Sequence, residues 1–398
     1  MNLKLLLIFF IILTFRFFFV HNNQPQYTDG QKISFKVRIL SQPHIVGTRQ
    51  AFSANYKNQK IRIVTSRFPE FNYGDFVRIS GSISIKDARL LMYYPKIEEM
   101  KDDSVLLGKS LKVVKNLRQK LIDLFSRTLP SPSSSLLMGI IFGIKEQMPK
   151  DFAESLKTTG VFHVIAASGM NVTLIGGFIS IFFAFLLKRQ IAIGLSILGI
   201  IFYAVLAGLE ASIIRASIMG IIVFSSQIMG RQSLAINGLA LAGFAMLFID
   251  PSLIFDIGFQ LSFASTLGIL YIKPLLTKKN IVGSEISTTV AAQTATLPIL
   301  LANFGTYSIY SILVNGLVLW TVQILMVIGG IGALIALVFM PLGQLIIYLS
   351  YPLLLYFESI VRFFGKMGGI ISIEALSFGF VAGYYCLLGS ALIILKKK

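Results

Sequence analysis

The sequence predicts a polytopic α-helical membrane protein with a small all-β domain near its N-terminus. Hydrophobic residues make up 55% of the 398 residues and charged residues only 14%, and the mean hydropathy is +0.76. This composition is far more apolar than that of a soluble domain. Apolar runs of membrane-crossing length recur through the second half of the chain. One stretch, residues 31–97, instead alternates apolar and polar residues with the period of two that is typical of strands.

Residues 1–22 predict an uncleaved transmembrane helix. The apolar run from Leu3 to Val20 is interrupted by Arg16 and is followed by no small-residue cleavage pattern. Lys4 places the N-terminus in the cytoplasm, because cytoplasmic ends of membrane helices are enriched in Lys and Arg.

Residues 30–100 predict an OB-like domain of about five short strands. Between Gln31 and Lys109 there are eight Lys and six Arg against seven acidic residues, a net charge of +7. A basic barrel with interleaved aromatic rings is suited to a single nucleic-acid strand, whose bases stack on the rings. The residues expected to contact such a strand are Phe52, Tyr56, Arg62, Tyr93 and Tyr94. The alternative for each ring is a place in the barrel core.

Residues 108–145 predict two helices that do not cross the membrane. Residues 111–129 have an amphipathic pattern and are expected to lie at the interface. The apolar run from Leu136 to Ile144 has nine residues, too few to span, and predicts a re-entrant or interfacial segment.

Residues 150–398 predict about nine spans. They are expected at 160–187, 190–209, 211–229, 233–249, 256–273, 286–304, 307–338, 341–364 and 374–395. The 307–338 run is too long for an untilted span, so a break or a strong tilt is expected near Gly329, Gly330 and Gly332. Basic residues follow alternate spans, which predicts a cytoplasmic C-terminus and an extracytoplasmic β domain.

The segment from Gly160 to Gly177 is the most unusual of these runs. It is expected to be a helix, yet it carries His163, Ser168 and Asn171 among apolar and small residues such as Gly169. Polar groups at membrane depth usually face a protein interior or a water-filled path, and small residues allow close helix packing.

Several further residues mark the later spans. Arg215 is expected to face an interior or a cavity, and Glu210 could pair with it if the helix is distorted. Asp256 is placed to cap a helix that contains Gly258 and Gln260. Pro298 suggests a kink whose freed carbonyls could line a cavity.

Catalysis is not expected. The AASG sequence around Ser168 resembles the serine motif of intramembrane proteases, but His163 lies five residues earlier, about 140° around an ideal helix. The chain has three His and one Cys, with no cluster at metal-ligand spacing, so no metal or cofactor is expected.

The motifs resemble those of the ComEC family of competence proteins. In order they are LLMGIIFG, GVFHVIAASGMNV, the pair Arg215–Ala216, DPSLIFDIGFQLSFAS, and a Pro-bearing span followed by Asn315. The resemblance covers about residues 136–335, and it implies an inner-membrane channel for DNA uptake with an OB-like domain outside the membrane.

The sequence departs from that family in three respects. Asn171 stands where many members have a histidine. The chain ends at Lys398 with no HxHxDH motif of the metallo-β-lactamase-like domain that many members carry, and one cysteine cannot form an internal disulfide. The resemblance therefore implies a short form, with nuclease activity supplied by a separate protein.

The hypothesis is a multi-pass channel of the cell (inner) membrane that carries single-stranded DNA into the cytoplasm during natural transformation. Its path is expected to involve His163, Ser168, Asn171, Arg215 and Gln260, with Gly169 and Gly258 allowing close packing. Besides DNA and membrane lipids, the expected partners are a surface DNA receptor, a cytoplasmic helicase or ATPase and a nuclease. The alternatives are a small-solute or lipid transporter with the same membrane domain, and a membrane scaffold that binds nucleic acid.

Overall fold

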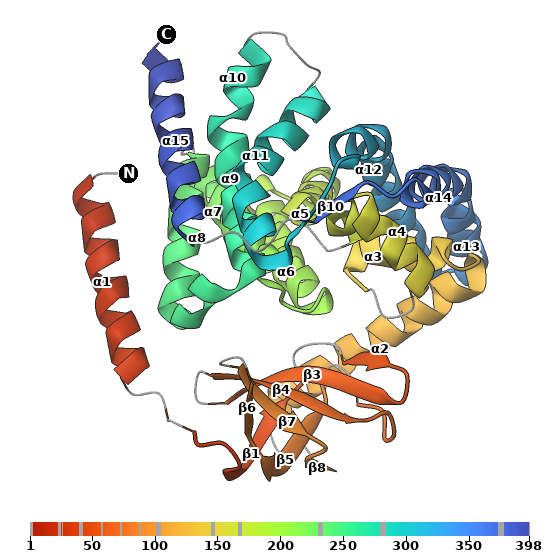
Figure 1. Cartoon of the computed structure of the whole chain (residues 1–398). Coiled ribbons are helices and arrows are strands. Elements are labelled where there is room, and N and C mark those ends of the chain that lie inside the picture. Colours follow the sequence, from red (N-terminus) through yellow and green to blue (C-terminus); the bar gives the residue numbers. More distant parts are fainter. Residues whose placement is uncertain are drawn as a thin grey trace. The chain divides into compact units, whose positions relative to one another are not determined.

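The computed structural model describes residues 3–22, 25, 27–39, 43–56, 59–71, 74–86, 89–100, 105–144, 148–165, 169–229, 234–278, 284–372 and 378–397. The chain divides into two compact units (Figure 1). The first comprises Met1–Leu121, Ala204–Leu209 and Gly243–Leu253, and the second comprises Ile122–Tyr203, Glu210–Ala242 and Ile254–Lys398.

The first unit contains the β domain. Its strands are β1 (Lys32–Arg38), β2 (His44–Val46), β3 (Arg49–Tyr56), β4 (Gln59–Ser66), β5 (Phe76–Ser82), β6 (Ser84–Lys86), β7 (Arg89–Tyr93) and β8 (Lys96–Glu99). They form two sheets, with strand orders β1-β5-β8 and β2-β3-β4-β7-β6. Neighbouring strands are antiparallel except β4 and β7, which are parallel. Alternate residues such as Phe35, Ile63 and Ile79 point into a shared core.

The expectation of about five strands was too low, because the described part of the β domain contains eight short strands. Ile83 separates β5 from β6, and its N–H bonds to the carbonyl of Gln31 at 2.9 Å, next to the last β1–β5 pair, Lys32 with Ser82. Tyr94 separates β7 from β8 and has a φ of 46°, a left-handed conformation that an extended strand cannot contain.

A buried glutamine organises one end of the five-stranded sheet. Gln50 is 1% exposed. Its Nε2 donates to the carbonyls of Ser66, Arg67 and Pro69 at 2.9, 3.1 and 2.5 Å, and its Oε1 accepts from the N–H of Phe71 at 3.2 Å. This side chain therefore pairs the backbone of a turn that leaves the sheet ladder.

Replacing this amide should loosen the β domain. Gln50→Leu leaves buried backbone groups without partners, and we expect the free energy of unfolding of the domain to fall by about 2–4 kcal/mol. Hydrogen exchange of peptides from β3 and β4 in the full chain measures the change. The control is Gln31→Leu, an exposed amide of the same domain, and an equal effect of both substitutions would contradict this role of Gln50.

Helix α1 (Leu3–Asn22) contacts the C-terminal part of α8 (Ala235–Ile249), the part from Gly243 on that belongs to the first unit. The rings of Phe9 and Phe244 stack at 4.1 Å between centroids. Arg16 Nε donates to the carbonyl of Phe248 at 3.3 Å, in the last turn of α8. Carbonyls at a helix C-terminus lack intrahelical partners and carry partial negative charge, which explains an arginine in an otherwise apolar helix.

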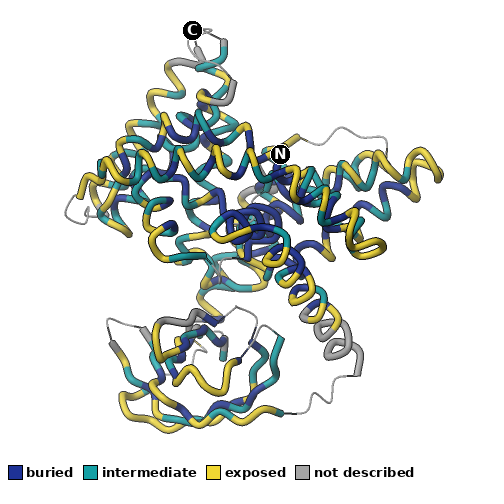
Figure 2. The backbone as a smooth tube through the Cα atoms, turned by 90° about the vertical axis from the view of Figure 1, so that its right-hand side faces the viewer, coloured by how far each residue is buried: buried dark blue, intermediate teal, exposed yellow. Residues whose placement is uncertain are grey.

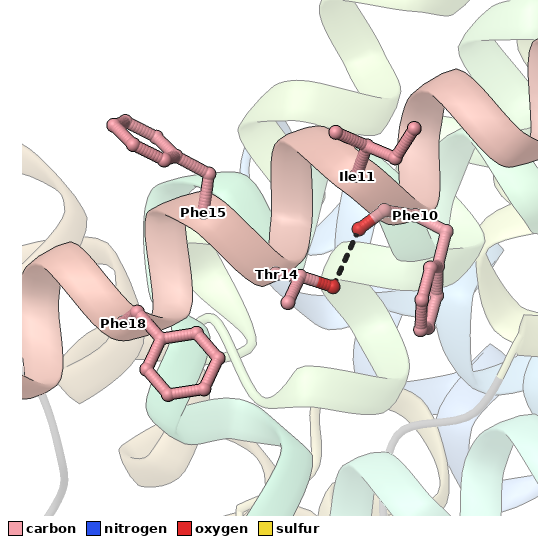
Figure 3. Close-up of a pocket in the computed structure, with 5 residues that line it drawn as sticks. All are labelled: Phe10, Ile11, Thr14, Phe15 and Phe18. Carbon is pink, nitrogen blue, oxygen red and sulfur yellow. Dashed lines mark hydrogen bonds between the residues drawn. The ribbon is translucent and has the colours of Figure 1, made fainter.

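Another side of α1 is apolar and exposed. Phe10, Ile11, Thr14, Phe15 and Phe18 line a shallow groove on this helix (Figure 3). The hydroxyl of Thr14 donates to the carbonyl of Phe10 at 2.8 Å. Because its only polar side chain is satisfied within the helix, this surface is suited to contact with lipid.

The remaining elements are predominantly helical. They are α2 (Val105–Thr128), α3 (Ser133–Phe142), α4 (Lys150–Thr158), η1 (Phe162–Ile165), α5 (Gly169–Ala184), α6 (Arg189–Leu206), α7 (Ala211–Ile228), η2 (Pro251–Phe255), α9 (Ile257–Tyr271), α10 (Lys273–Lys278), α11 (Ser284–Phe304), β9 (Thr306–Ser308), α12 (Ser311–Ala336), α13 (Met340–Tyr348), α14 (Tyr351–Lys366), β10 (Ile370–Ser372) and α15 (Phe378–Lys397). Many of the helices carry exposed residues along one side (Figure 2).

Five helical stretches of the described chain are long and apolar enough to cross a membrane. They are Arg189–Leu206, Ala211–Ile228, Ile257–Thr277, Ser311–Ala336 and Met340–Lys366. Shorter apolar helices of 10–17 residues include Gly169–Ala184 and Ala235–Ile249. The last of the five long stretches, expected as one helix, is divided between α13 and α14.

The expected continuous helix from Gly160 to Gly177 was wrong. Gly160 has a φ of 73° and ends α4. The N–H of Val161 bonds to the carbonyl of Leu156, and the N–H of Gly160 bonds to that of Lys157, both at 3.0 Å. These bonds form a Schellman motif, the usual C-terminal stop at a glycine. The chain then continues as the short helix η1, and α5 begins only at Gly169.

The break expected within residues 307–338 does not occur in α12, which is a continuous helix of 26 residues. Its glycines instead allow close packing. A Cβ at Gly329 would overlap Ile141 of α3, and a Cβ at Gly332 would lie 2.7 Å from Ile347 of α13. All ten residues of α3 are buried.

The carbonyl freed by Pro298 is satisfied by a neighbouring helix, contrary to the expectation that it lines a cavity. Proline has no N–H, so the carbonyl four residues earlier, that of Thr294, loses its intrahelical donor. The hydroxyl of Tyr384 on α15 donates to this carbonyl at 2.8 Å. The hydroxyl of Tyr385 donates to the next carbonyl, Ala295, at 2.8 Å.

An ion-pair network joins α4 to α14. Arg362 Nη1 lies 3.0 Å from Asp151 Oδ2, and Arg362 Nε lies 2.9 Å from Glu358 Oε1. The hydroxyl of Ser133 on α3 is 3.4 Å from Glu358 Oε2. The hydrogen bond from Arg362 holds the pKa of Asp151 below its usual value.

The lowered pKa of Asp151 makes the stability of the protein depend on pH. Because the pKa of Asp151 is lower in the folded protein, its contribution to stability is present above about pH 4, the unfolded pKa, and is lost as pH falls through the folded pKa. Melting temperatures of wild type and Asp151→Asn should therefore differ at neutral pH and converge below about pH 4. The control is Glu154→Gln on the same helix. A gap that persists at low pH would contradict the role of the carboxylate charge.

Candidate functional site

A cavity of about 520 Å³ lies among α5, α7 and α9 in the second unit. Its lining residues come almost entirely from α5 and α7. They are Gly169, Thr173, Gly177, Ser180, Ile181, Arg215, Ala216, Met219, Gly220, Val223, Phe224, Gln227 and Thr266. The set combines apolar side chains with hydroxyl and amide groups and one charged residue.

Arg215 provides the charge and is 8% exposed. Its Nη1 donates to the carbonyl of Ser262 and to the hydroxyl of Thr266, both on α9. Its Cζ lies 6.0 Å from the ring centroid of Phe263. These contacts hold the guanidinium against α9 with neutral partners. A charge placed this way keeps its attraction for an anion.

The rest of the guanidinium borders the cavity. Arg215 Nη2 lies 3.4 Å from the position that a Cβ at Gly169 would take, and both residues line the cavity. The absence of a side chain at Gly169 therefore leaves room beside Nη2. Among the described residues that line the cavity, none is acidic. The arrangement favours an anion or a strongly polar group within an otherwise apolar wall.

Asn171 is fully inside the protein but does not line this cavity. It is 2% exposed, and its Nδ2 donates to the carbonyl of Ile140 at 2.7 Å and to the hydroxyl of Tyr203 at 3.1 Å. The hydroxyl of Tyr203 in turn donates to the carbonyl of Ile141 at 2.8 Å. Both carbonyls belong to the last turn of α3, so Asn171 and Tyr203 cap that helix from α5 and α6.

The other expected path residues are placed differently. His163 is exposed in η1, with Nδ1 3.2 Å from the carbonyl of Gly160. Gln260 donates to the carbonyl of Ile254 at 2.8 Å. Ser168 lies outside the described residues. Of the five residues expected on the path, the structure therefore brings Arg215 to the cavity.

The two glycines expected to allow close helix packing differ in what surrounds them. Gly169 borders Ala216 and Arg215 of α7. A Cβ at Gly258 would meet only the carboxylate of Asp256 within 4 Å, among the described atoms. The close approach of α9 to α11 occurs instead at Gly268, where a Cβ would overlap the backbone of Ala291. Asp256 caps α9 as expected, accepting from the N–H of Phe259 at 3.0 Å.

A second cluster of polar residues, missed as a unit in the sequence, joins α11, β9 and α12. Gln293 donates to the hydroxyl of Ser311 at 2.6 Å and accepts from that of Tyr307 at 2.8 Å. Asn315 donates to Ser311 at 3.3 Å. A Cβ at Gly160 would lie 2.6 Å from the hydroxyl oxygen of Ser311, so the end of α4 packs directly on this cluster.

The five residues of the β domain that were expected to contact nucleic acid fall into two groups, which differ in burial. Phe52 is 3% exposed and belongs to the core, and Tyr56 stacks on Phe35 with 4.6 Å between ring centroids. Alternation on β3 turns both toward the core, so Phe52 takes the core alternative, whereas Tyr56 is only partly buried and its surface role stays a prediction. Arg62, Tyr93 and Tyr94 are exposed.

The exposed residues belong to a larger surface on the five-stranded sheet. We call it the aromatic–arginine patch, and it consists of Arg49, Arg62, Arg67, Phe68, Tyr93 and Tyr94. Val64 pairs with both Ala51 of β3 and Tyr93 of β7, which places these strands side by side. The guanidinium of Arg49 lies 5.9 Å from the ring of Tyr94, and that of Arg67 lies 5.3 Å from the ring of Phe68. Rings beside cations are the combination that contacts single-stranded nucleic acid.

Comparison with known proteins identifies a family and two relatives. The family model described as "Competence protein" matches residues 140–398. ComE operon protein 3 of Bacillus subtilis (strain 168) is 26% identical over 204 residues, which are 51% of this chain and 26% of that protein. An uncharacterized protein of Aquifex aeolicus (strain VF5) is 28% identical over 208 residues, 50% of this chain and 48% of that protein. No solved structure matches.

The alignments thus span about a quarter and about half of the lengths of these two relatives. The family model, in contrast, covers well over half of this chain and includes the cavity, Arg215 and the Asn171 cap. With its five apolar membrane-length stretches, the chain is a membrane protein of the ComEC family of competence proteins.

Proposed function

We propose that this protein forms a path by which single-stranded DNA crosses the cell membrane into the cytoplasm during natural transformation. The observation that carries the proposal is the Arg215 cavity, in which a buried cation borders a space lined by no acidic residue of the described chain. A phosphodiester needs donors and positive potential where water is scarce, and carboxylates would repel it.

The aromatic–arginine patch supports the same function. Bases that stack on Phe68, Tyr93 and Tyr94, with phosphates near Arg49 and Arg62, would hold a single strand without reading its sequence. Uptake of any sequence requires this kind of contact.

Contacts within each unit support the proposed orientation, in which both termini are cytoplasmic and the β domain is outside. The lysine and arginine pattern assigns the segments that form β9 and β10 to the outer side, and these two strands pair with each other. Gly160 and Ser311, assigned to the same side, pack together. In the first unit, Arg16 and Phe248 are both near outer helix ends by this pattern, and they are bonded.

Energy for transport would come from another protein, because the sequence contains no phosphate-binding loop. A cytoplasmic helicase or ATPase is therefore part of the proposal, together with the surface DNA receptor and the nuclease that are expected as partners.

A small-solute or lipid transporter is the alternative, and one observation favours it. Ile181, Met219, Val223 and Phe224 line the same cavity, and such a wall accepts an acyl chain. A transporter of this kind should give a growth or uptake defect in the absence of DNA.

Transformation assays test the DNA path. Deleting the gene should abolish transformation while leaving DNA bound at the cell surface. In the complemented strain, Arg215→Gln should lower transformation about 10- to 100-fold, the value of a charged hydrogen bond. Arg215→Lys keeps the positive charge and should therefore retain part of the transformation activity.

A matched pair of glycines separates cavity effects from folding effects. Neither Gly177 of the cavity nor Gly194 of α6 has a neighbouring atom within 4 Å of a built Cβ. Gly177→Phe should therefore fill the cavity and block transformation, whereas Gly194→Phe should leave it unchanged at equal protein levels. Normal transformation with Gly177→Phe would exclude this cavity as the path.

The patch is tested by binding. Phe68→Ala and Tyr93→Ala should each weaken binding of a fluorescent single-stranded oligonucleotide to the full chain by about 1–3 kcal/mol, as measured by anisotropy. The control is Ile85→Ala, an exposed apolar residue of the same sheet. If neither ring substitution weakens binding, or if binding does not depend on salt concentration, the aromatic–arginine patch is not the DNA-binding surface.

A further inference from the structure

The outer face of the three-stranded sheet is strongly basic. The registers pair Lys36 with Arg78 and Arg78 with Glu98, so these side chains stand on one face. The same alternation adds further positions to that face. The basic sheet face consists of Lys32, Lys36, Arg38, Arg78 and Lys96. Its one carboxylate, Glu98, lies 2.8 Å from Lys96 Nζ.

This face differs chemically from the aromatic–arginine patch. Three of its five cations are lysines, and all three are exposed. Its aromatic ring, Phe76, is half-buried, with the guanidinium of Arg38 5.7 Å from its centroid. Such a surface offers point charges without rings for bases to stack on. It therefore fits an array of anionic groups better than a nucleic-acid strand.

The chain also tethers this sheet to membrane elements at both ends. Nine residues lie between the end of α1 at Asn22 and the start of the first strand, β1, at Lys32. Five residues lie between the end of the last strand, β8, at Glu99 and the start of α2 at Val105. Linkers of these lengths reach at most about 30 and 20 Å when fully extended. Both outer strands of the sheet are thus held near α1, an apolar helix, and α2, an amphipathic one.

We propose that the basic sheet face binds the anionic headgroups of the bilayer beside it, so that the domain rests on phospholipid. Each Lys or Arg near an anionic surface strengthens binding about fivefold. Occupation of this face by lipid leaves the other sheet, with its aromatic–arginine patch, open to solvent.

The test uses the full chain in nanodiscs of phosphatidylcholine, with or without phosphatidylglycerol. A fluorophore is attached to the thiol of Ser82→Cys in a Cys386→Ser background, because Ser82 is exposed and pairs with Lys32. A nitroxide on the lipid headgroup reports proximity by quenching. We expect strong quenching only with phosphatidylglycerol, and its loss at high salt.

Charge reversal provides the matched control. Lys32→Glu/Lys36→Glu/Arg78→Glu should lower the ratio of membrane-bound to free domain at least about a hundredfold. Arg49→Glu/Arg62→Glu/Arg67→Glu makes the same charge change on the aromatic–arginine patch and should leave quenching intact. Quenching that is independent of phosphatidylglycerol, or unaffected by the first triple substitution, overturns the proposal. The proposal is also overturned if a single-stranded oligonucleotide abolishes the quenching in the Arg49→Glu/Arg62→Glu/Arg67→Glu variant. That result would identify the basic sheet face as a nucleic-acid surface.

Discussion

The arrangement of the helical unit depends on satisfying buried polar groups without water. The last carbonyls of α3 are bonded by Asn171 and Tyr203, and the carbonyl opposite Pro298 is bonded by Tyr384. Each bond joins helices distant in sequence, because an unpaired carbonyl in an apolar interior is costly. These bonds fix α5 and α6 against α3, and α15 against α11. The position of α5, which forms one wall of the cavity, follows from the cap that Asn171 makes.

Arg215 is a buried charged residue whose hydrogen-bond partners on α9, Ser262 and Thr266, are neutral. Its bonds to Ser262 and Thr266 anchor the side chain, yet its charge is still directed to a space without lining carboxylates. The network of Arg362 with Asp151 and Glu358 shows the opposite solution, in which two acids neutralise one arginine. The first arrangement suits passage of an anion and the second suits helix docking. The same residue type thus serves two purposes, which its surroundings distinguish.

Sequence reasoning succeeded where residue type or a local pattern carries the information. The period of two located the β domain, Asp256 was recognised as a helix cap, and Arg215 was expected to face an interior. It failed at Gly160, whose stop signal is local, and at a ring of β3 whose packing partners are distant. Gly160 was interpreted within a helix although it ends the preceding one, and Phe52 was assigned to the surface although it packs inside. The error at Gly160 was avoidable, because a glycine at this point of Leu156–Val161 is the usual sequence signal for the end of a helix.

By itself, the sequence determined the class of protein, the apolar character of its helices, the basic charge of its β domain and the motifs of its family, because composition and short-range periodicity carry this information. The tertiary structure alone decided what the polar residues do. Asn171 and Arg215 are both polar residues of apolar helices, yet one caps α3 and the other borders the cavity. Their difference lies in which distant backbone each side chain reaches, and only the packing of the helices sets that distance.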